Sequence, residues 1–199
     1  MSLFAAQQAG LVFPALLSEK YRPRLLDDFV GLDKPKKVLA KFAASPFPNA
    51  AFLFVGPSGT GKTSMALALC EAIGAELHHV PSQRANVETI EDTVRQCHYV
   101  PRNGARSLHV VLVDEADQMS SAAQLSLLSK LDSTSFPPST VFIFTANDTE
   151  RLQDRFLSRC MTLAFSSHGM AKDIALLLER IWLAEAGETV ERPNFLRAA

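Results

Sequence analysis

The octapeptide from Gly56 to Thr63 constrains the fold of this chain more than any other feature. It follows the pattern G-x-x-x-x-G-K-T of a phosphate-binding loop. The apolar run Ala51–Val55 before it predicts a buried strand, and the Ala- and Leu-rich run Ser64–Leu69 after it predicts a helix. A chance glycine-rich turn is the alternative interpretation. Because a strand, a glycine loop and a helix N-terminus form the context in which this pattern holds an anion, we interpret it as a phosphate site.

The chemistry of the loop indicates a nucleotide and a divalent cation as cofactors. Glycines let backbone N–H groups curve around phosphate oxygens, and the positive end of the helix dipole faces the same anion. We expect Lys62 to reach the β- and γ-phosphates of ATP, and the Thr63 hydroxyl to ligate Mg²⁺. The expected nucleotide-binding residues of this segment are Gly56, Pro57, Ser58, Gly59, Thr60, Gly61, Lys62, Thr63 and Ser64.

Composition indicates an ordered globular chain. At 199 residues, 47% of them hydrophobic, the chain suits one domain, or one domain plus a fragment, with a real core. Lys and Arg number 20 and Asp and Glu 21, so the net charge of −1 does not indicate a nucleic-acid-binding protein, and DNA contact would need a local basic face. No apolar run reaches transmembrane length, so no membrane partner is expected.

The cysteines and the N-terminus bear on the compartment. Cys70, Cys97 and Cys160 are far apart in the sequence and form no C-x-x-C pair, so their spacing does not predict a zinc site. Such scattered cysteines are typical of a reducing compartment, so we expect the cytoplasm, close to the nucleoid, or the nucleus of a eukaryote. The first residues lack the basic segment of a signal peptide, so residues 1–18 are interpreted as a packing arm or a disordered tail, with a signal peptide as the minor alternative.

Strand-like and helix-like segments alternate along the chain. The expected strands are Phe52–Val55, Leu77–Val80, Leu108–Val113, Val141–Thr145 and Met161–Phe165. The expected helices are Pro35–Ala44, Lys62–Ile73, Val87–His98, Ser120–Leu131, Arg151–Leu157 and Met170–Ala186. This alternation predicts an α/β domain built of βαβ units, with a parallel sheet and helices on both of its faces.

An acidic motif follows one of these strands. The apolar run Val110–Val113 ends in Asp114 and Glu115, which is the Walker B arrangement when it lies beside a phosphate loop. We expect Asp114 to hold Mg²⁺, directly or through water, and Glu115 to act as the general base toward the attacking water. Acidic surface residues at a strand end are the alternative, and the phosphate loop argues against it.

Two further polar residues are candidates for the same chemistry. Asn147 closely follows another apolar strand, where its amide could orient a water because it both donates and accepts hydrogen bonds. A simple turn formed with Asp148 is an equally good interpretation of that asparagine. Arg159, after a short helix, reads by itself as an ordinary surface charge.

Together these motifs resemble the clamp-loader ATPases of the AAA+ superfamily, in particular the small subunits of replication factor C and the bacterial gamma/tau subunits. The resemblance runs from Leu17 to Gly187. Its elements, in chain order, are Glu19–Pro23, Leu26–Gly31, the phosphate loop, the Asp114–Asp117 box, Asn147 and the triplet Ser158-Arg159-Cys160. Several motifs in the right order are far more specific than any one of them.

The resemblance implies the architecture. It indicates a P-loop AAA+ three-layer domain whose parallel sheet has the strand order 5-1-4-3-2. The ATPase core would span residues 19–167, after the arm of residues 1–18. Residues 168–199 would begin a helical lid that stops early, and no counterpart of the family's collar domain is expected within these 199 residues.

The resemblance also implies roles for particular residues. The family lines its adenine and ribose pocket with the segment before the loop, which here supplies Tyr21, Arg22, Pro23, Val30 and Gly31. The arginine of the triplet acts in trans on ATP bound by the neighbouring subunit, and Arg155 is a weaker candidate for that task. The expected catalytic residues are therefore Lys62, Glu115, Asn147 and Arg159, with Thr63 and Asp114 as metal ligands.

Three departures from the family pattern qualify the function. The chain lacks the cysteine-rich zinc insertion of the gamma/tau subunits, which favours the replication factor C pattern. The helix Ser120–Leu131, where the family places DNA-facing basic residues, carries only Lys130. Other basic candidates for DNA contact are Arg84, Arg95, Arg102 and Arg106. In the lid, Arg192 and Arg197 are poor substitutes for the second sensor arginine of the family.

The first hypothesis is an ATP-hydrolysing clamp-loader-like subunit in DNA replication or repair, assembled with neighbouring AAA+ subunits on DNA, with a sliding clamp as a further candidate partner. The second is a nucleotide-gated interaction module that hydrolyses little ATP and docks on a partner loader or helicase. A helicase loader and a branch-migration motor are further alternatives, which the Tyr21-Arg22-Pro23 and Ser158-Arg159-Cys160 motifs disfavour. A small-molecule kinase would need a substrate-binding lid and would not need Asn147 and Arg159.

Overall fold

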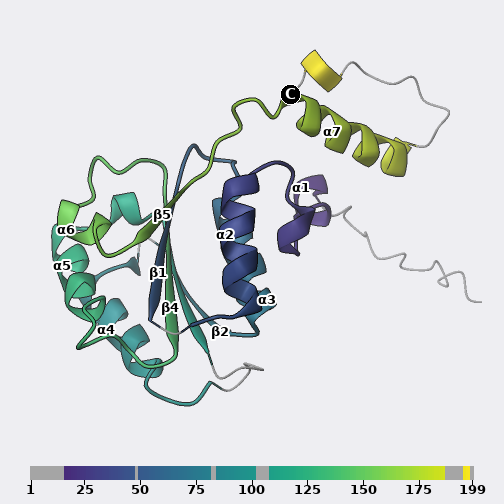
Figure 1. Cartoon of the computed structure of the whole chain (residues 1–199). Coiled ribbons are helices and arrows are strands. Elements are labelled where there is room, and N and C mark those ends of the chain that lie inside the picture. The colour runs from purple at the N-terminus through teal and green to yellow at the C-terminus, as the bar shows by residue number, and fades with distance from the viewer. Residues whose placement is uncertain (1–15, 48, 82–83, 102–107, 187–194, 198–199) are drawn as a thin grey trace, which may run out of the picture.

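The computed structural model describes residues 16–47, 49–81, 84–101, 108–186 and 195–197 of the chain. Most of the predicted N-terminal arm, together with Arg102, Arg106, Gly187 and Arg192, lies outside the described residues. Figure 1 shows a sheet between two helical layers, with a further helix beyond the sheet's upper edge.

The sheet has five strands in the order β2-β3-β4-β1-β5, which is the predicted order read from the other side. The strands are β1 (Ala50–Val55), β2 (Glu76–Pro81), β3 (His109–Asp114), β4 (Thr140–Ala146) and β5 (Met161–Ala164). All four neighbouring pairs are parallel. Because the carboxyl ends of parallel strands meet at one edge of a sheet, Val55, Asp114 and Ala146 end close together.

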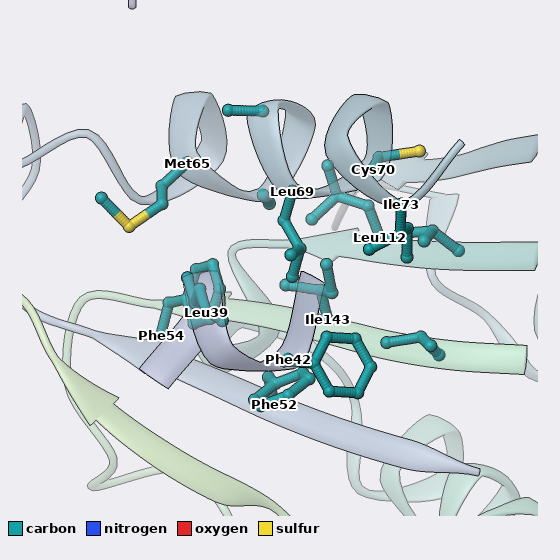
Figure 2. Packing of buried hydrophobic residues seen from close by; sticks show 14 of the residues in the cluster. Leu39, Phe42, Phe52, Phe54, Met65, Leu69, Cys70, Ile73, Leu112 and Ile143 are labelled. Atoms are coloured by element: carbon teal, nitrogen blue, oxygen red, sulfur yellow. The ribbon is translucent and has the colours of Figure 1, made fainter. Parts of the chain in front are cut away.

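Alternating side chains of the strands build one core on each face of the sheet. Phe52 and Phe54 of β1 point into the layer formed by α2 (Asp33–Ala44) and α3 (Lys62–Ile73), as Figure 2 shows. Leu53 points into the opposite layer, formed by α4 (Val87–Gln96), α5 (Ser121–Lys130) and α6 (Asp154–Leu157). The predicted three-layer α/β architecture is confirmed, since both strand faces are apolar and both are covered.

The bounds of α3 match the prediction because glycines define both ends. Gly61 (φ 87°) precedes the helix, and Gly74 (φ 63°) follows it and donates its N–H to Glu71 O at 3.0 Å. Both backbones lie in the left-handed region, which glycine adopts without a Cβ penalty. The helix therefore begins at Lys62, directly behind the phosphate loop.

Three predicted helices differ from their predicted bounds by two residues or more, and the first of them, α2, begins at Asp33 rather than at Pro35. The helix expected over Arg151–Leu157 starts at Asp154, because the buried Gln124 side chain on α5 holds the backbone of residues 151–153 in a non-helical conformation. Its Nε2 donates to Arg151 O at 2.9 Å, and its Oε1 accepts from Gln153 N at 3.0 Å. The helix expected to reach His98 ends at Gln96.

The segment before the core and the last long helix pack together. The N-terminal segment forms α1 (Leu17–Lys20) and η1 (Leu26–Asp28), which the sequence did not predict, and the last long helix is α7 (Ala171–Ala186). Lys20 Nζ and Tyr21 Oη each lie 2.5 Å from Glu185 Oε1, which raises the pKa of both donors and lowers that of Glu185. Gly31 faces the Met170 side chain so closely that a Cβ there would lie 2.5 Å from Met170 Cε.

Among the described residues, no helix is long and apolar enough to cross a bilayer.

Candidate nucleotide-binding site

The phosphate loop joins β1 to α3 and leaves space above its glycines. Gly59 (φ 79°) has nothing within 4 Å of a Cβ built on its backbone, so its open side can receive a ligand. Thr60 Oγ1 donates to Pro57 O at 2.8 Å, which closes the turn. Gly61 O accepts from Met65 N at 2.8 Å and starts the helix, so the loop lies at a helix N-terminus.

Gly56 is required by sterics at the base of the loop. A Cβ there would lie 1.9 Å from Phe165 O, far inside van der Waals contact. This close approach lets Phe165 N donate to Val55 O at 2.7 Å and carries the pairing of β1 with the chain beyond β5. Gly56 therefore shapes the loop from below and is itself buried.

Lys62 holds its ammonium at the centre of the site. Its Nζ donates to Gly56 O at 2.6 Å, Pro57 O at 2.9 Å and Asn147 Oδ1 at 3.1 Å. All three acceptors are uncharged, and within the described residues Lys62 has no carboxylate within 4.0 Å. Burial lowers the pKa of Lys62, and the more distant charges of Asp117, Asp114 and Glu115 oppose that change. A buried cation bound only to neutral oxygens fits a polyphosphate.

Asp114 lies between the loop and the neighbouring strands. Its Oδ1 accepts from Thr63 Oγ1 at 2.8 Å and from Thr145 Oγ1 at 2.6 Å. Its Oδ2 lies 3.4 Å from Nε2 of His79, a residue within the neighbouring strand β2. A carboxylate and a hydroxyl at hydrogen-bond distance are hard oxygen donors of the kind that Mg²⁺ prefers. The two predicted metal ligands are thus adjacent, and they fit a divalent cation.

Glu115 and Asn147 follow the ends of adjacent strands. Glu115 adopts a left-handed backbone (φ 52°), and its N–H donates to Thr145 Oγ1 at 3.0 Å. A non-glycine residue in this region is uncommon and often marks a functional position, and its side chain is exposed at the cavity. Asn147 N donates to the buried carboxylate of Asp117 at 3.2 Å, which leaves its side-chain oxygen on Lys62.

A cavity of about 830 Å³ connects these groups to the base of α7. Fourteen of the predicted site residues line it: Tyr21, Arg22, Pro23, Val30, Ser58, Gly59, Thr60, Gly61, Lys62, Thr63, Ser64, Asp114, Glu115 and Asn147. The sequence missed the apolar residues that close its other side, namely Leu17, Phe29, Leu32, Met170, Ile174, Leu178 and Ile181, and also Thr145. A pocket with an apolar end and a cationic end fits a base joined to a polyphosphate.

Four predicted residues lie outside the lining of the cavity: Gly31, Gly56, Pro57 and Arg159. Gly31, Gly56 and Pro57 act from behind it through their backbones. Arg159 follows α6, which in Figure 1 lies on the opposite side of the sheet from α1 and α7. Its Nη2 lies 3.2 Å from Asp132 Oδ2, and its Nη1 donates to Arg155 O at 3.2 Å. Arg159 therefore does not line the cavity of its own chain.

The comparisons with known proteins agree with this geometry. Residues 52–167 match the family model described as "ATPase family associated with various cellular activities (AAA)". Replication factor C small subunit 1 of Pyrobaculum aerophilum is 34% identical over 180 residues, which is 87% of this chain and 52% of that protein. Replication factor C small subunit of Picrophilus torridus is 32% identical over 155 residues, covering 74% of this chain and 48% of the relative. The chain thus spans about half the length of these curated relatives.

Solved structures show the same fold at lower sequence identity. The RuvB Holliday junction branch migration motor of Thermotoga maritima superposes with a TM-score of 0.69 and 17% identity, over 83% of this chain and 55% of that one. A single-residue variant of that motor gives a TM-score of 0.70 with the same identity and coverage. At this identity the likeness concerns the fold alone. The family model covers more than half of the chain, and the two relatives are 34% and 32% identical to it over most of its length: the chain belongs to the AAA family of ATPases and is related to the small subunits of replication factor C.

Proposed function

We propose that this protein binds and hydrolyses ATP with Mg²⁺ as a subunit of a clamp-loader-type assembly in DNA replication or repair. The observation that carries the proposal is the Lys62 ammonium, which is buried among neutral oxygens beside the Thr63–Asp114 pair. A bound polyphosphate would supply the counter-charge that the described surroundings of Lys62 lack at short range. The relationship to replication factor C small subunits supports the clamp-loader part of the proposal.

The residues divide the work of binding. The open backbone of Gly59 and the N-terminus of α3 receive phosphate oxygens, and Lys62 exchanges its carbonyl partners for them. Tyr21 and Val30 lie with α7 residues around the apolar end of the cavity, where a purine base would bury its faces. Thr63 and Asp114 would hold Mg²⁺, which neutralises charge on the β- and γ-phosphates when it is bound.

Glu115 and Asn147 are the residues proposed to act on the attacking water. Glu115 accepts a proton from this water as general base. The backbone N–H of Glu115 donates to Thr145 Oγ1, and this bond sets the direction of the Glu115 side chain. Asn147 orients the same water through its amide, held in place by Asp117. Both side chains reach the cavity from adjacent strands, as these roles require.

Arg159 is proposed to complete the site of a neighbouring subunit. It is exposed, it is absent from the lining of its own cavity, and its present partner is the exposed carboxylate of Asp132. A surface ion pair of this kind is weak and exchanges easily for a phosphate. An arginine finger delivered in trans accelerates hydrolysis by about 10³–10⁵ in other nucleotide hydrolases. Hydrolysis would then depend on assembly.

The proposal that this protein contacts DNA is supported by its relatives and by only a few basic residues of the chain itself. Arg84 is exposed, Arg95 is paired with Asp92 at 3.3 Å, and Lys130 ends α5. Few phosphate contacts give binding that weakens with salt, because affinity comes mainly from counterion release. A DNA effect on turnover should therefore appear at low ionic strength first.

The test is steady-state ATP turnover at increasing protein concentration, with and without primed DNA. The wild type is compared with Glu115→Gln and Arg159→Ala, and Arg155→Ala, which removes a cation one helical turn earlier, is the matched control. We expect turnover per chain to rise with concentration, to increase with DNA, and to be lost in the first two variants but kept in the control.

Turnover per chain that stays constant across concentration, and is equal in the wild type and Arg159→Ala, would contradict the assembly-dependent site. Tight ATP binding with negligible turnover under every condition would favour instead a nucleotide-gated interaction module. The binding residues of the site would be the same in that case, and the partner would supply the missing catalytic element.

A further inference from the structure

A second polar cluster lies at the edge of the sheet opposite the phosphate loop. His109 begins β3, His78 lies in β2 next to it, and Cys97 directly follows α4. One ligand atom from each side chain lies within 4.8 Å of the other two. Asp114 ends the strand that His109 begins, so the length of β3 separates this cluster from the candidate nucleotide site.

Hydrogen bonds set the protonation of the two imidazoles. His109 Nε2 lies 2.8 Å from Tyr99 O, and because a carbonyl can only accept, this nitrogen carries the proton. In the neutral ring His109 Nδ1 then carries a lone pair, which accepts a hydrogen bond from His78 Nε2 at 3.0 Å. A histidine whose second ring nitrogen donates to a backbone carbonyl is the usual form of a metal ligand.

The spacing and burial of the three groups suit a tetrahedral ion. Zinc–nitrogen bonds of about 2.0–2.1 Å and zinc–sulfur bonds of about 2.3 Å place tetrahedral ligand atoms about 3.3–3.7 Å apart. The two imidazole nitrogens are 3.0 Å apart and all three ligand atoms lie within 4.8 Å of one another, which brackets that spacing. His109 is 2% exposed and Cys97 1%, so two of the three ligands are already held by packing. His78 borders a cavity of about 470 Å³ with Glu76 and Gln96, which gives room for a water at a fourth position.

We propose that His78 Nε2, Cys97 Sγ and His109 Nδ1 bind a zinc ion, with water as the fourth ligand. Two imidazoles and a thiolate are the ligands that zinc takes in proteins. Binding releases the thiol proton of Cys97 to solvent, and the proton that His78 Nε2 now donates to His109 Nδ1 moves to His78 Nδ1, which frees Nε2 for the ion. The ion takes the place of the single hydrogen bond that now joins the two histidines.

Zinc at this position would cross-link the end of α4 to two strands of the sheet. Cys97 stands at the end of α4, whereas His78 and His109 belong to neighbouring strands whose pairing begins at Glu76 and His109. Burial raises the pKa of Cys97 to about 11, so the thiol is protonated without an ion and zinc must displace that proton. Because the ion would connect the end of α4 to two paired strands, and the length of β3 separates it from Asp114, we expect it to stabilise the fold and not to take part in turnover.

The proposal is tested on the full chain, purified under reducing conditions and stripped of metal by dialysis against a chelator. Zinc affinity is measured by competition with a chromophoric chelator, and cobalt is added separately as a spectroscopic probe. The variants are Cys97→Ser and His78→Gln. The matched controls are Cys70→Ser, another buried cysteine, and His98→Gln, the exposed histidine beside Cys97.

We expect one zinc per chain in the wild type and in both controls, and at least about a tenfold loss of affinity in Cys97→Ser and His78→Gln. Wild type with cobalt should show a thiolate-to-cobalt charge-transfer band and the intense visible bands of a tetrahedral ion. Circular dichroism verifies that the variants are folded, and the cobalt spectrum of the wild type needs no variant. A wild type without such bands, or a Cys97→Ser variant with wild-type affinity, would overturn the proposal.

Discussion

Two glycines of the phosphate loop should respond very differently to the same added methyl group. A Cβ on Gly56 would lie 1.9 Å from Phe165 O and 2.8 Å from Phe165 C, both backbone atoms. Relief requires one of the two chains to move by more than about 1 Å to reach van der Waals contact. Gly59 has open space around it, and there the methyl group meets only the strain of a positive φ of 79°.

The loss of folding stability in Gly56→Ala follows from the contacts of Phe165 that this displacement of the backbone would disturb. Phe165 N donates to Val55 O at 2.7 Å, and its buried ring packs on Phe54 with centroids 4.9 Å apart. Losing that hydrogen bond and overpacking the contact should lower the free energy of unfolding by about 2–4 kcal/mol. Gly59→Ala carries a strain of about 1–2 kcal/mol, partly offset by the smaller freedom of its unfolded chain, and should cost about 1 kcal/mol.

The two variants are compared with the wild type by thermal unfolding without nucleotide, followed by circular dichroism. For a chain of this size each kcal/mol corresponds to about 2–4 °C, so Gly56→Ala should lower Tm by about 5–15 °C and Gly59→Ala by about 4 °C or less. Equal losses, or a larger loss in Gly59→Ala, would refute the steric account of Gly56.

Three further predictions concern the candidate site. Lys62→Met should weaken ATP binding by about 10–100-fold, because charged hydrogen bonds are lost, while Tm without nucleotide stays the same or rises; titration with a fluorescent ATP analogue measures the first, and an unchanged affinity would contradict it. Glu115→Gln should keep ATP affinity but lower the single-turnover rate by about 10²–10⁴, and a wild-type rate would exclude it as general base. Tyr21→Phe removes a hydrogen-bond donor to Glu185, so amide hydrogen exchange should become faster in α7 but not in β1. Tyr99→Phe is the control. Unchanged exchange in α7 of Tyr21→Phe would show that this contact does not hold the helix.

The parts of the fold that local signals specify could be predicted from the sequence. The phosphate loop, with glycines at both ends of α3, fixes one strand–helix unit, and apolar runs mark the buried strands. The predicted start of α6 was wrong because the side chain that determines where the helix begins, Gln124, belongs to another helix. No periodicity within residues 151–157 carries that information.

The same limit applies to the candidate site. Asp114 and Asn147 could be singled out because parallel strands end at one edge of the sheet. Thr145 and His79, which contact Asp114 across strands, and the apolar face of α7 were missed, since pairing and packing bring them there. The cluster of His78, Cys97 and His109 was missed for a similar reason: its members lie on three elements, and their spacing matches no zinc motif.

The central claim is a site shared between subunits, and mixing two variants tests it most directly. Lys62→Met should bind nucleotide weakly but retain Arg159, whereas Arg159→Ala should bind nucleotide but lack the finger. Each alone is expected to turn over little ATP. If Arg159 acts in trans, an equimolar mixture should regain a substantial fraction of wild-type turnover, because the intact arginine of one subunit meets the intact site of another. A mixture no more active than its two components, at concentrations where the wild type is active, would contradict the account.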